Sequence, residues 1–255
     1  MTFAQRYGPW ALVAGASEGI GAAFARELSA RGVGVVLVAR RPEPLAALQL
    51  PGPRLEVSAD LATLDGLEAV FEATRELEIG FVVANAALSP IGPFSSSDPA
   101  ELVRAIDLNC RAPMLLARRF LPEMAGRRHG GFVVMSSLAG AQGSPGISVY
   151  AGTKALGAVL AEGLWAEFRP SGVDVLACVA GAVSTPGLAS ATAKAAPGTV
   201  EPAQVVAAAL AALGKRPRTV PGAMMKASAA FLSRALPRRT AISIMQRASR
   251  DVLAP

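Results

Sequence analysis

Residues 10–21 read Trp10-Ala-Leu-Val-Ala14-Gly15-Ala-Ser-Glu-Gly19-Ile-Gly21, and this stretch decides the fold. Its first five residues are apolar, as in a buried strand, and helical spacing begins after Gly21. A strand, a glycine-rich turn and a helix in this order are the context in which a dinucleotide pyrophosphate is bound. Gly15 permits the tight turn, Gly19 lets the backbone approach the phosphates, and Gly21 lets the helix pack on the strand. The cofactor-binding residues expected here are Gly15, Ser17, Glu18, Gly19, Ile20 and Gly21.

The second expected strand, Val33–Ala39, is followed by Arg40 and Arg41. Folds that bind NAD place an acid near this point for the ribose 2′-hydroxyl, whereas those that bind NADP place an arginine there for the 2′-phosphate. Ala39 and Arg40 therefore favour NADP(H) over NAD(H), with Arg41 as a second candidate. The alternative is that both arginines are simply solvated.

The rest of the chain continues to alternate strands and helices. Further strands are expected at Leu55–Leu61, Phe81–Ala87, Phe132–Ser137 and Gly172–Val179, with a short edge strand at Thr219-Val220. Helices are expected at Leu64–Leu77, Pro99–Met124 and Glu201–Leu213, and around Tyr150 as far as Phe168. This alternation predicts an α/β fold: a doubly wound, Rossmann-like parallel sheet of about seven strands, in one domain spanning residues 1–255.

Other cofactor contacts are expected where these strands end. Asp60 and Leu61 close the third strand, where the acid can meet the adenine, and Asn85 and Ala86 form a small-residue turn after the fourth. Val183 and Thr185 follow the sixth strand, where Thr185 can bond the nicotinamide amide. Residues 184–200 are rich in Ala, Gly and Ser, and we expect them to form a mobile substrate lid.

Tyr150 and Lys154 lie four residues apart, so on a helix they share a face. A phenol has a pKa of about 10, and a cation about 4 Å away lowers it by roughly three units at a moderate dielectric. General acid–base catalysis is most efficient near neutrality. We therefore expect Tyr150 to transfer a proton, with Ser137, thirteen residues earlier, bonding the reacting oxygen. Taken alone, this pair also fits two solvated side chains.

Asn109 interrupts the apolar face of the helix expected at Pro99–Met124. Pro113, four residues later, has no N–H to bond the Asn109 carbonyl, so the helix should kink there. A carbonyl freed in this way can hold a water on a proton path. The alternative is a core amide whose side chain is satisfied by backbone.

Composition narrows the functional classes. The chain has 255 residues, 52% hydrophobic and 17% charged, so it should bury a sizeable core. The only histidine, His129, lies in a polar turn, which argues against a zinc site and a Ser-His-Asp hydrolase. Aromatic residues make up 5% and no basic run is interleaved with them, so nucleic acid is not an expected partner. Cys110 and Cys178 stand far apart, which favours free thiols and a cytoplasmic location.

The basic charge is concentrated in the C-terminal tail. Residues 215–255 hold nine cations and one acid, a charge of +8, so with +6 for the whole chain the first 214 residues carry −2. Residues 221–255 are expected to be helical and to mix these cations with apolar side chains. The tail either packs on the core or a partner subunit, or forms an amphipathic surface for an anionic membrane or an acidic substrate carrier.

Taken together, these residues resemble the short-chain dehydrogenase/reductase family over nearly the whole chain. The matching residues are Gly15, Gly19, Gly21, Asp60, Asn85, Ala86, Asn109, Ser137, Tyr150, Lys154, Val183 and Thr185. The departures are Ala14, Ala84, Ala87 and Ala180, in turns where the family usually has other residues. None of them removes a catalytic group, although they bear on the hydrogen bonds of the cofactor turns.

The resemblance implies a nicotinamide cofactor and the catalytic residues Asn109, Ser137, Tyr150 and Lys154. By this likeness Tyr150 moves the proton, Ser137 orients the carbonyl and the Asn109 backbone holds a relay water. Lys154 bonds the nicotinamide ribose and lowers the phenol pKa, so Tyr150 and Lys154 also count as cofactor-binding residues. The family also pairs its long helices between subunits, which implies a homodimer or homotetramer.

The expected function is NADP(H)-dependent interconversion of a ketone and a secondary alcohol. An apolar substrate is favoured by Leu138, Ile147, Leu188, Met224 and Met225, although these residues also fit an ordinary core. The tail loosely resembles reductases of long-chain acyl and steroid ketones. The alternative is a cofactor-binding sensor or scaffold without turnover, against which the intact Ser137, Tyr150 and Lys154 argue.

Overall fold

The computed structural model describes residues 1–191, 198–230 and 237–253. Its centre is a seven-stranded sheet in the order β3-β2-β1-β4-β5-β6-β7, and every neighbouring pair is parallel. The strands are β1 Trp10–Ala14, β2 Gly34–Ala39, β3 Arg54–Ser58, β4 Ile79–Ala84, β5 Gly130–Ser137, β6 Val173–Ala180 and β7 Arg218–Thr219. The predicted doubly wound, Rossmann-like fold is confirmed.

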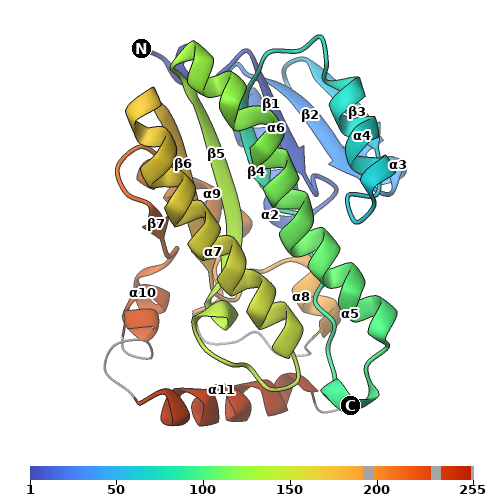
Figure 1. Ribbon diagram of the computed structural model, residues 1–255, viewed down its shortest axis with the longest axis vertical. Helices are drawn as coiled ribbons and strands as arrows, with labels where there is room; N and C mark the ends of the chain where they lie inside the picture. The colour runs from blue at the N-terminus through green and yellow to red at the C-terminus, as the bar shows by residue number, and fades with distance from the viewer. Residues whose placement is uncertain (192–197, 231–236, 254–255) are drawn as a thin grey trace.

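Helices cover both faces of this sheet (Figure 1). One face carries α2 Gly19–Ala30 and α9 Pro202–Ala212, and the other carries α4 Leu64–Ala73, α6 Ala112–Arg127 and α7 Ser148–Phe168. Successive strand residues alternate between the two cores: Val13 and Val35 face the first, whereas Leu12 and Val36 face the second. Strands buried on both sides read as continuous apolar runs, which is why they were recognisable in the sequence.

The strand order reverses between β1 and β4. From β1 the chain moves outward through β2 to β3, then returns to the other side of β1 to form β4. In open α/β sheets, ligands bind outside the carboxyl ends of the strands at such a switch point. The cofactor residues expected from the sequence follow the carboxyl ends of these strands.

Two predicted strands end earlier than expected. β3 stops at Ser58, so Asp60 and Leu61 lie in the following turn, and β4 stops at Ala84. The reason for the second is local: the backbone N–H groups of both Asn85 and Ala86 donate to the Ala14 carbonyl. One acceptor shared by consecutive donors ends the regular ladder and leaves both residues facing the glycine turn.

The long helix expected at Pro99–Met124 is instead three segments. α5 spans Pro99–Ile106, a π-helical turn, η2, spans Asp107–Arg111, and α6 begins at Ala112. The Ala112 N–H bonds the carbonyl of Asp107, five residues back. Pro113 has no N–H to offer the preceding turn, so the hydrogen-bond ladder widens rather than simply kinking.

Apart from α9 and β7, the elements that follow β6 gather beyond the carboxyl ends of the strands. They include α8 Pro186–Ala191, α10 Ala223–Ala230 and α11 Arg238–Leu253, which crosses below α7 (Figure 1). The helical tail is confirmed for residues 223–230 and 238–253, whereas parts of the expected lid (192–197) and tail (231–236 and 254–255) fall outside the described residues. Within the described ranges, no helix combines the length and apolarity needed to cross a membrane.

The remaining elements are short. The sequence pattern did not predict α1 Phe3–Tyr7, α3 Pro42–Ala46, or the 3-10 turns η1 Phe94–Ser96, η3 Leu138–Ala141 and η4 Arg169–Ser171. Each has three to five residues, too few for an apolar period to be read.

Candidate active site

A cleft of about 350 Å³ opens at the carboxyl ends of β1, β2 and β4. Most of the residues expected to bind the cofactor line it: Gly15, Ser17, Glu18, Gly19, Ile20, Arg40, Arg41, Asp60, Leu61, Asn85, Ala86 and Thr185. These residues come from five separate segments of the chain, and the fold brings them to one place.

The glycine turn is shaped for a close approach to a ligand and to its own neighbours. Gly15 and Gly19 have φ values of +79° and +55°, in the left-handed region that favours glycine. A Cβ on Gly21 would lie 1.9 Å from the Gly15 carbonyl oxygen, so only glycine allows α2 to begin here. The turn leads directly into the N-terminus of α2, whose free N–H groups suit a pyrophosphate. The residues present therefore fit a dinucleotide.

Arg40 and Arg41 lie exposed at the rim of the cleft, directly after β2. The Arg40 carbonyl accepts a hydrogen bond from the Ser58 hydroxyl at 3.0 Å, which fixes the backbone while the Arg40 side chain stays in solvent. The Arg41 guanidinium lies 4.0 Å from the Glu18 carboxylate. Of the two arginines, Arg40 is the one without an ion-pair partner among the described residues.

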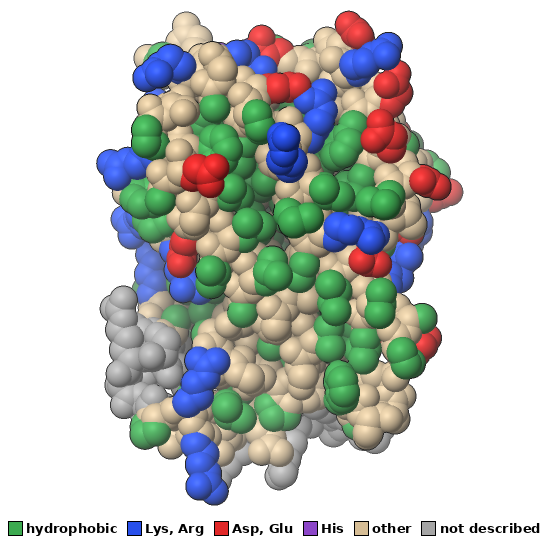
Figure 2. Space-filling view, viewed as in Figure 1, with side chains coloured by type: hydrophobic (Ala, Val, Ile, Leu, Met, Phe, Trp, Pro, Cys, Tyr) green, Lys and Arg blue, Asp and Glu red, His purple; other side chains and the backbone are tan. Residues whose placement is uncertain are grey.

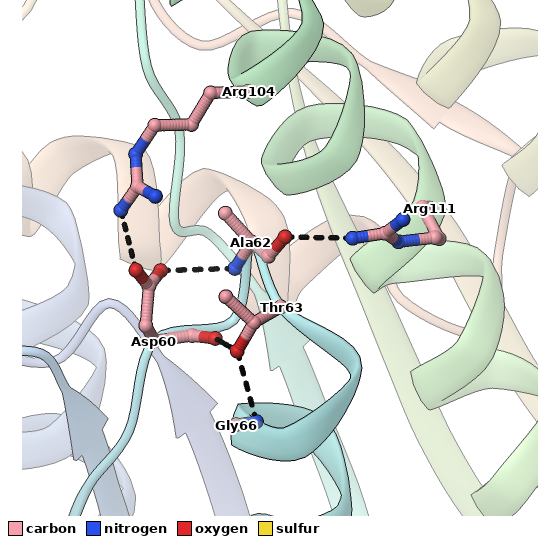
Figure 3. Close-up of polar contacts among 6 residues, drawn as sticks. All are labelled: Asp60, Ala62, Thr63, Gly66, Arg104 and Arg111. Atoms are coloured by element: carbon pink, nitrogen blue, oxygen red, sulfur yellow. Dashed lines mark hydrogen bonds and ion pairs between the residues drawn. The ribbon is translucent and has the colours of Figure 1, made fainter. Parts of the chain in front are cut away.

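Asp60 lies in the turn after β3 (Figure 3). One carboxylate oxygen accepts from the Ala62 N–H at 3.0 Å, and the other accepts from the Arg104 guanidinium at 2.5 Å. Burial raises the pKa of Asp60, but these two hydrogen bonds and the nearby charges of Arg104 and Arg40 outweigh it and leave the pKa below its ordinary value. Asp60 is therefore an ionised acceptor at the end of the cleft near Arg40.

Asn85 joins the two halves of the cleft. Its side-chain amide donates to the Gly15 carbonyl at 3.0 Å, which ties the turn after β4 to the turn after β1. Thr185 stands opposite, and its methyl group would lie 2.9 Å from a Cβ on Gly19. Val183 is buried and pairs with Val200 in an isolated bridge, so it supports the site without lining the cleft.

Ser137, Tyr150 and Lys154 meet where β5 ends and α7 begins. Ser137 is the last residue of β5; its hydroxyl accepts from the Ala139 N–H at 3.2 Å and lies close enough to the Tyr150 phenol to lower the pKa of that phenol. Lys154 lies one turn further along α7, with Nζ 5.6 Å from the centre of the Tyr150 ring. The same Nζ donates to the Met135 carbonyl at 2.9 Å, and Lys154 is 6% exposed. The predicted sharing of one helix face by Tyr150 and Lys154 is confirmed.

The expected lowering of the Tyr150 pKa by Lys154 is not what this geometry gives. Burial raises the pKa of the phenol above its ordinary value, and the nearby Ser137 hydroxyl is the opposing influence. Burial also lowers the pKa of Lys154 to about 8, against a smaller opposing effect from Cys110. The reason is that both groups are desolvated, which disfavours the charged form of each and outweighs the attraction assumed from spacing alone.

The Asn109 side chain is buried and fully engaged. Its Oδ1 accepts from the Leu88 N–H at 2.8 Å, and its Nδ2 donates to the Leu88 carbonyl at 2.8 Å and to the Thr153 hydroxyl at 3.0 Å. Asn109 thus links the π-helical turn to α7, one residue before Lys154. The side-chain amide of Asn109 is thus a hydrogen-bonded core group, as the alternative interpretation expected. Only the backbone carbonyl of Asn109 is left as a candidate to hold a water on a proton path.

The cleft has further walls that the sequence did not single out. Val38, Ala59, Leu108 and Gly187 also line it. Val38 and Ala59 precede Arg40 and Asp60 by one or two residues, so proximity in sequence was an available signal. Leu108 comes from the π-helical turn, and only the tertiary fold brings it to the cleft.

A family model described as short chain dehydrogenase matches residues 9–196. The chain belongs to the short-chain dehydrogenase family. It is 35% identical over 192 residues to the 7beta-hydroxysteroid dehydrogenase of Clostridium sardiniense, covering 73% of this chain and 74% of that protein. It is therefore an NAD(P)-dependent oxidoreductase, and its relatives support oxidoreduction between a ketone and an alcohol.

Solved structures of the family agree with this fold. A 7beta-hydroxysteroid dehydrogenase structure superposes with a TM-score of 0.90 at 28% identity, covering 96% of this chain and 99% of the other. The short-chain dehydrogenase from Sphingobium yanoikuyae in complex with NADPH gives a TM-score of 0.76 at 33% identity, over 84% of this chain and 86% of the other.

Proposed function

We propose that this short-chain dehydrogenase interconverts a ketone and a secondary alcohol on an apolar, steroid-like substrate, using NADP(H) in preference to NAD(H). The observation that carries the proposal is the meeting of Ser137, Tyr150 and Lys154 at the carboxyl end of β5. The cleft that fits a dinucleotide opens at the same ends of the strands, although none of the three residues lines it. The three side chains suit a carbonyl oxygen that must be held and protonated.

In the proposed mechanism a nicotinamide cofactor held in the cleft would supply or take up the hydride. The Tyr150 phenol carries the proton to or from the substrate oxygen, and the neighbouring Ser137 hydroxyl orients the same oxygen. Lys154 provides positive charge beneath the Tyr150 ring and a donor that can exchange its Met135 partner for a ribose hydroxyl. The Asn109 carbonyl, four residues before Pro113, is the proposed holder of a relay water.

The cofactor preference rests on Arg40. It is exposed at the cleft rim, directly after β2, and no acid stands in its place to receive a ribose 2′-hydroxyl. A solved structure similar to this chain, the short-chain dehydrogenase from Sphingobium yanoikuyae, holds NADPH. Both observations support NADP(H), with the 2′-phosphate held by Arg40.

An apolar substrate is supported by the residues around the carboxyl edge. Met224 and Met225 of α10 approach Gly198, where a Cβ would lie 2.6 Å and 3.1 Å from their methyl carbons. Met225 also lies against Gly181, at the end of β6. Leu138, Ile147 and Leu188 lie close in sequence to residues of the site. Together with the flexible side chains of the two methionines, they suit a large apolar molecule. A long-chain acyl ketone is the second substrate class that this lining fits.

The segment 184–200 is the proposed substrate lid. Its described ends are tied together: the Ser184 N–H donates to the Val200 carbonyl at 2.9 Å, and the Val200 N–H donates to the Ala182 carbonyl at 3.1 Å. A loop whose ends are fixed can open and close without disturbing β6.

A homodimer or homotetramer is proposed from the exposed face of α5, α6 and α7. Five large apolar side chains stand in solvent there: Val103, Ile106, Met114, Leu156 and Val159. Figure 2 shows hydrophobic side chains spread over these helices on the viewed side of the molecule. A monomer rarely leaves so much apolar surface uncovered, so a second copy of the chain is the proposed occupant.

In the described part of the basic tail, some side chains pack against the rest of the protein and others are exposed to solvent. Ala241 is buried, Ile242 lies 3.7 Å from the Cβ position of Gly143, and Arg238 donates to the Ala141 carbonyl. Lys226 and Arg239 stay exposed, as do the apolar Met224 and Ile244. This mixture supports contact with an anionic lipid surface, with an acidic carrier as the competing partner. The two cysteines are buried free thiols, which suits a cytoplasmic enzyme.

The rival function is a cofactor-binding sensor without turnover. A panel of steroid, acyl and small ketones, each incubated with NADPH and then with NADH, separates the two. We expect consumption of NADPH with at least one bulky apolar ketone. Tight dinucleotide binding with no consumption across the panel, and none in the reverse direction with the matching alcohols, would favour the sensor.

A further inference from the structure

The turn that carries Asp60 is held from behind by two arginines of the helical stretch 99–111. Arg104 of α5 donates to the Asp60 carboxylate at 2.5 Å, and Arg111 of the π-helical turn donates to the Ala62 carbonyl at 2.6 Å (Figure 3). Both donors reach across from another part of the chain, 44 and 49 residues away. The loop after β3 therefore takes its position from helix α5 and the turn after it, as well as from its own sheet.

The hydrogen bond from Arg104 orients the Asp60 carboxylate, which belongs to the cofactor cleft. Asp60 and Leu61 line the cleft, whereas Arg104 lies outside the residues that line it. The Asp60 carboxylate has one oxygen on the Ala62 N–H and the other on Arg104, so its plane is set by two donors at once. Without Arg104, only the contact within its own turn would remain, and the carboxylate could rotate about its χ2 torsion.

Arg104 and Asp60 also form an ion pair. Arg104 and Asp60 are each about one-third exposed at their side chains, so the pair is shielded in part from solvent. Of the influences that lower the Asp60 pKa below its ordinary value, the hydrogen bond from Arg104 is the largest. Charge-assisted hydrogen bonds of this kind are shorter and stronger than neutral ones, and they fix geometry.

We propose, resting on the function proposed above, that Arg104 is a positioning residue for the dinucleotide. It fixes the Asp60 carboxylate as an acceptor at the adenosine end of the cleft and does not itself touch the cofactor. The nearest competing role is purely structural, in which the ion pair only ties α5 to the loop after β3. The two roles differ in what they do to adenosine binding.

Four variants distinguish them. Arg104→Met removes the charge and the donor while keeping a long apolar stem, and Arg104→Lys restores a cation. Asp60→Asn alters the group on which Arg104 acts, and the double variant joins it to Arg104→Met. Arg118→Met is the matched control, because Arg118 is an exposed arginine of the neighbouring α6 with no ion pair among the described residues.

The readout is binding to the full chain. Dissociation constants are measured by fluorescence titration or calorimetry for NADPH, NADH and adenosine 2′,5′-bisphosphate, with the melting temperature recorded for each variant. In Arg104→Met we expect all three constants to rise by about tenfold, as for the loss of one charge-assisted hydrogen bond. Arg104→Lys should recover part of this loss. The double variant should bind no more weakly than Asp60→Asn alone, because both changes act on one interaction.

Unchanged affinity for adenosine 2′,5′-bisphosphate in Arg104→Met would overturn the proposal. So would full additivity of the Asp60 and Arg104 changes, or an equal loss in Arg118→Met. A failure of the unaltered chain to bind either dinucleotide is a different result, since it would overturn the proposed function itself.

Discussion

The chain has two tyrosines, Tyr150 and Tyr7, and they lie at opposite ends of the strands. Tyr150 stands beside Ser137 where β5 ends, whereas Tyr7 lies against Gly80 and Gly131 where β4 and β5 begin. The Tyr7 hydroxyl donates to Asp174 at 2.7 Å and has no access to the cleft. The chain thus contains its own control for the removal of a phenol hydroxyl.

Tyr150→Phe should lower kcat by at least about 100-fold while changing the dissociation constant for NADPH by less than about twofold. Only the proton carrier is removed, and general acid–base groups contribute roughly 10²–10⁴ in rate. Tyr7→Phe should leave kcat unchanged and lower the free energy of unfolding by about 1–2 kcal/mol, because it deletes one buried hydrogen bond. Steady-state kinetics and urea denaturation measure both. Near-normal turnover in Tyr150→Phe would rule out the proposed mechanism.

Arg40→Ala tests the cofactor preference. The dissociation constant for NADPH should rise by about tenfold or more, and that for NADH by less than about twofold, because only NADPH carries the 2′-phosphate. NADH serves as the internal control for damage to the cleft. Equal losses for the two cofactors, measured by fluorescence titration, would mean that Arg40 does not read the phosphate.

Lys154 links the site to folding stability through its pKa, which burial lowers from 10.5 to about 8 in the folded protein. Below pH 8 the lysine is charged in both states, so the folded state bears the cost of burying that charge. Between pH 8 and 10.5 the folded state releases the proton first, and stability rises with pH across this window. The shift corresponds to about 3 kcal/mol, partly offset in any variant by loss of the bond to Met135.

Lys154→Met should therefore abolish turnover and yet raise the free energy of unfolding at pH 7 by about 1–3 kcal/mol. The gain over the unaltered chain should shrink as the pH rises from 8 toward 10. Lys226→Met, at an exposed lysine of α10, should change neither quantity. Urea denaturation at pH 7 and pH 9.5 measures the difference, and a destabilised Lys154→Met at pH 7 would contradict the buried-charge account.

At the scale of elements, α5 has two roles. Its inner side holds Asp60 through Arg104, and its outer side exposes Val103 and Ile106 to solvent at 57% and 47%. α7 likewise carries Tyr150 and Lys154 near its start and exposes Val159 at 68%. A subunit contact on this surface would therefore stiffen the same helices that position the site.

Val159→Asp should dissociate the proposed oligomer, because a lone carboxylate in an apolar interface is costly to desolvate. Sedimentation velocity at micromolar concentration should then give a monomer for the variant and a dimer or tetramer for the unaltered chain. Leu64→Asp is the control: Leu64 is 59% exposed but lies at the start of α4, where an acid is compatible with the helix. A monomeric unaltered chain would refute the interface.

A feature could be predicted from the sequence when the residues that define it lie close together along the chain. The glycine turn and the Tyr150–Lys154 pair were predictable because the residues that define each of them lie no more than six positions apart. The π-helical turn was anticipated only as a kink, since Pro113 marks where the ladder breaks but not how it reforms. The grip of Arg104 on Asp60 joins residues 44 apart, and the Lys154 bond to Met135 spans 19. Contacts at that range depend on the packed sheet, and a period along the chain carries no sign of them.

At the scale of the whole molecule, charge is divided unevenly. The first 214 residues carry −2 and the remaining 41 carry +8. Lys215 and Arg216 precede β7, at the amino edge of the sheet, whereas Lys226, Arg238 and Arg239 are on α10 and α11 beyond its carboxyl edge. The two groups of cations therefore face opposite ends of the molecule, and only the second borders the site.

Because the two groups of cations are separated, a membrane contact can be tested with two variants that have the same net charge but lose their cations at opposite ends of the molecule. In co-flotation with vesicles of anionic or neutral lipid, we expect the unaltered chain to favour the anionic vesicles at low salt and to lose that preference as salt screens it. Each cation near such a surface contributes roughly 1 kcal/mol, so Arg238→Glu with Arg239→Glu should weaken binding by well over tenfold. Lys215→Glu with Arg216→Glu makes the same change in net charge at the far edge, and it should retain most of the binding. If both double variants lose binding equally, the attraction belongs to net charge and not to a docking face. If the unaltered chain shows no anionic preference even at low salt, the exposed cations of α10 and α11 serve packing or an acidic carrier instead.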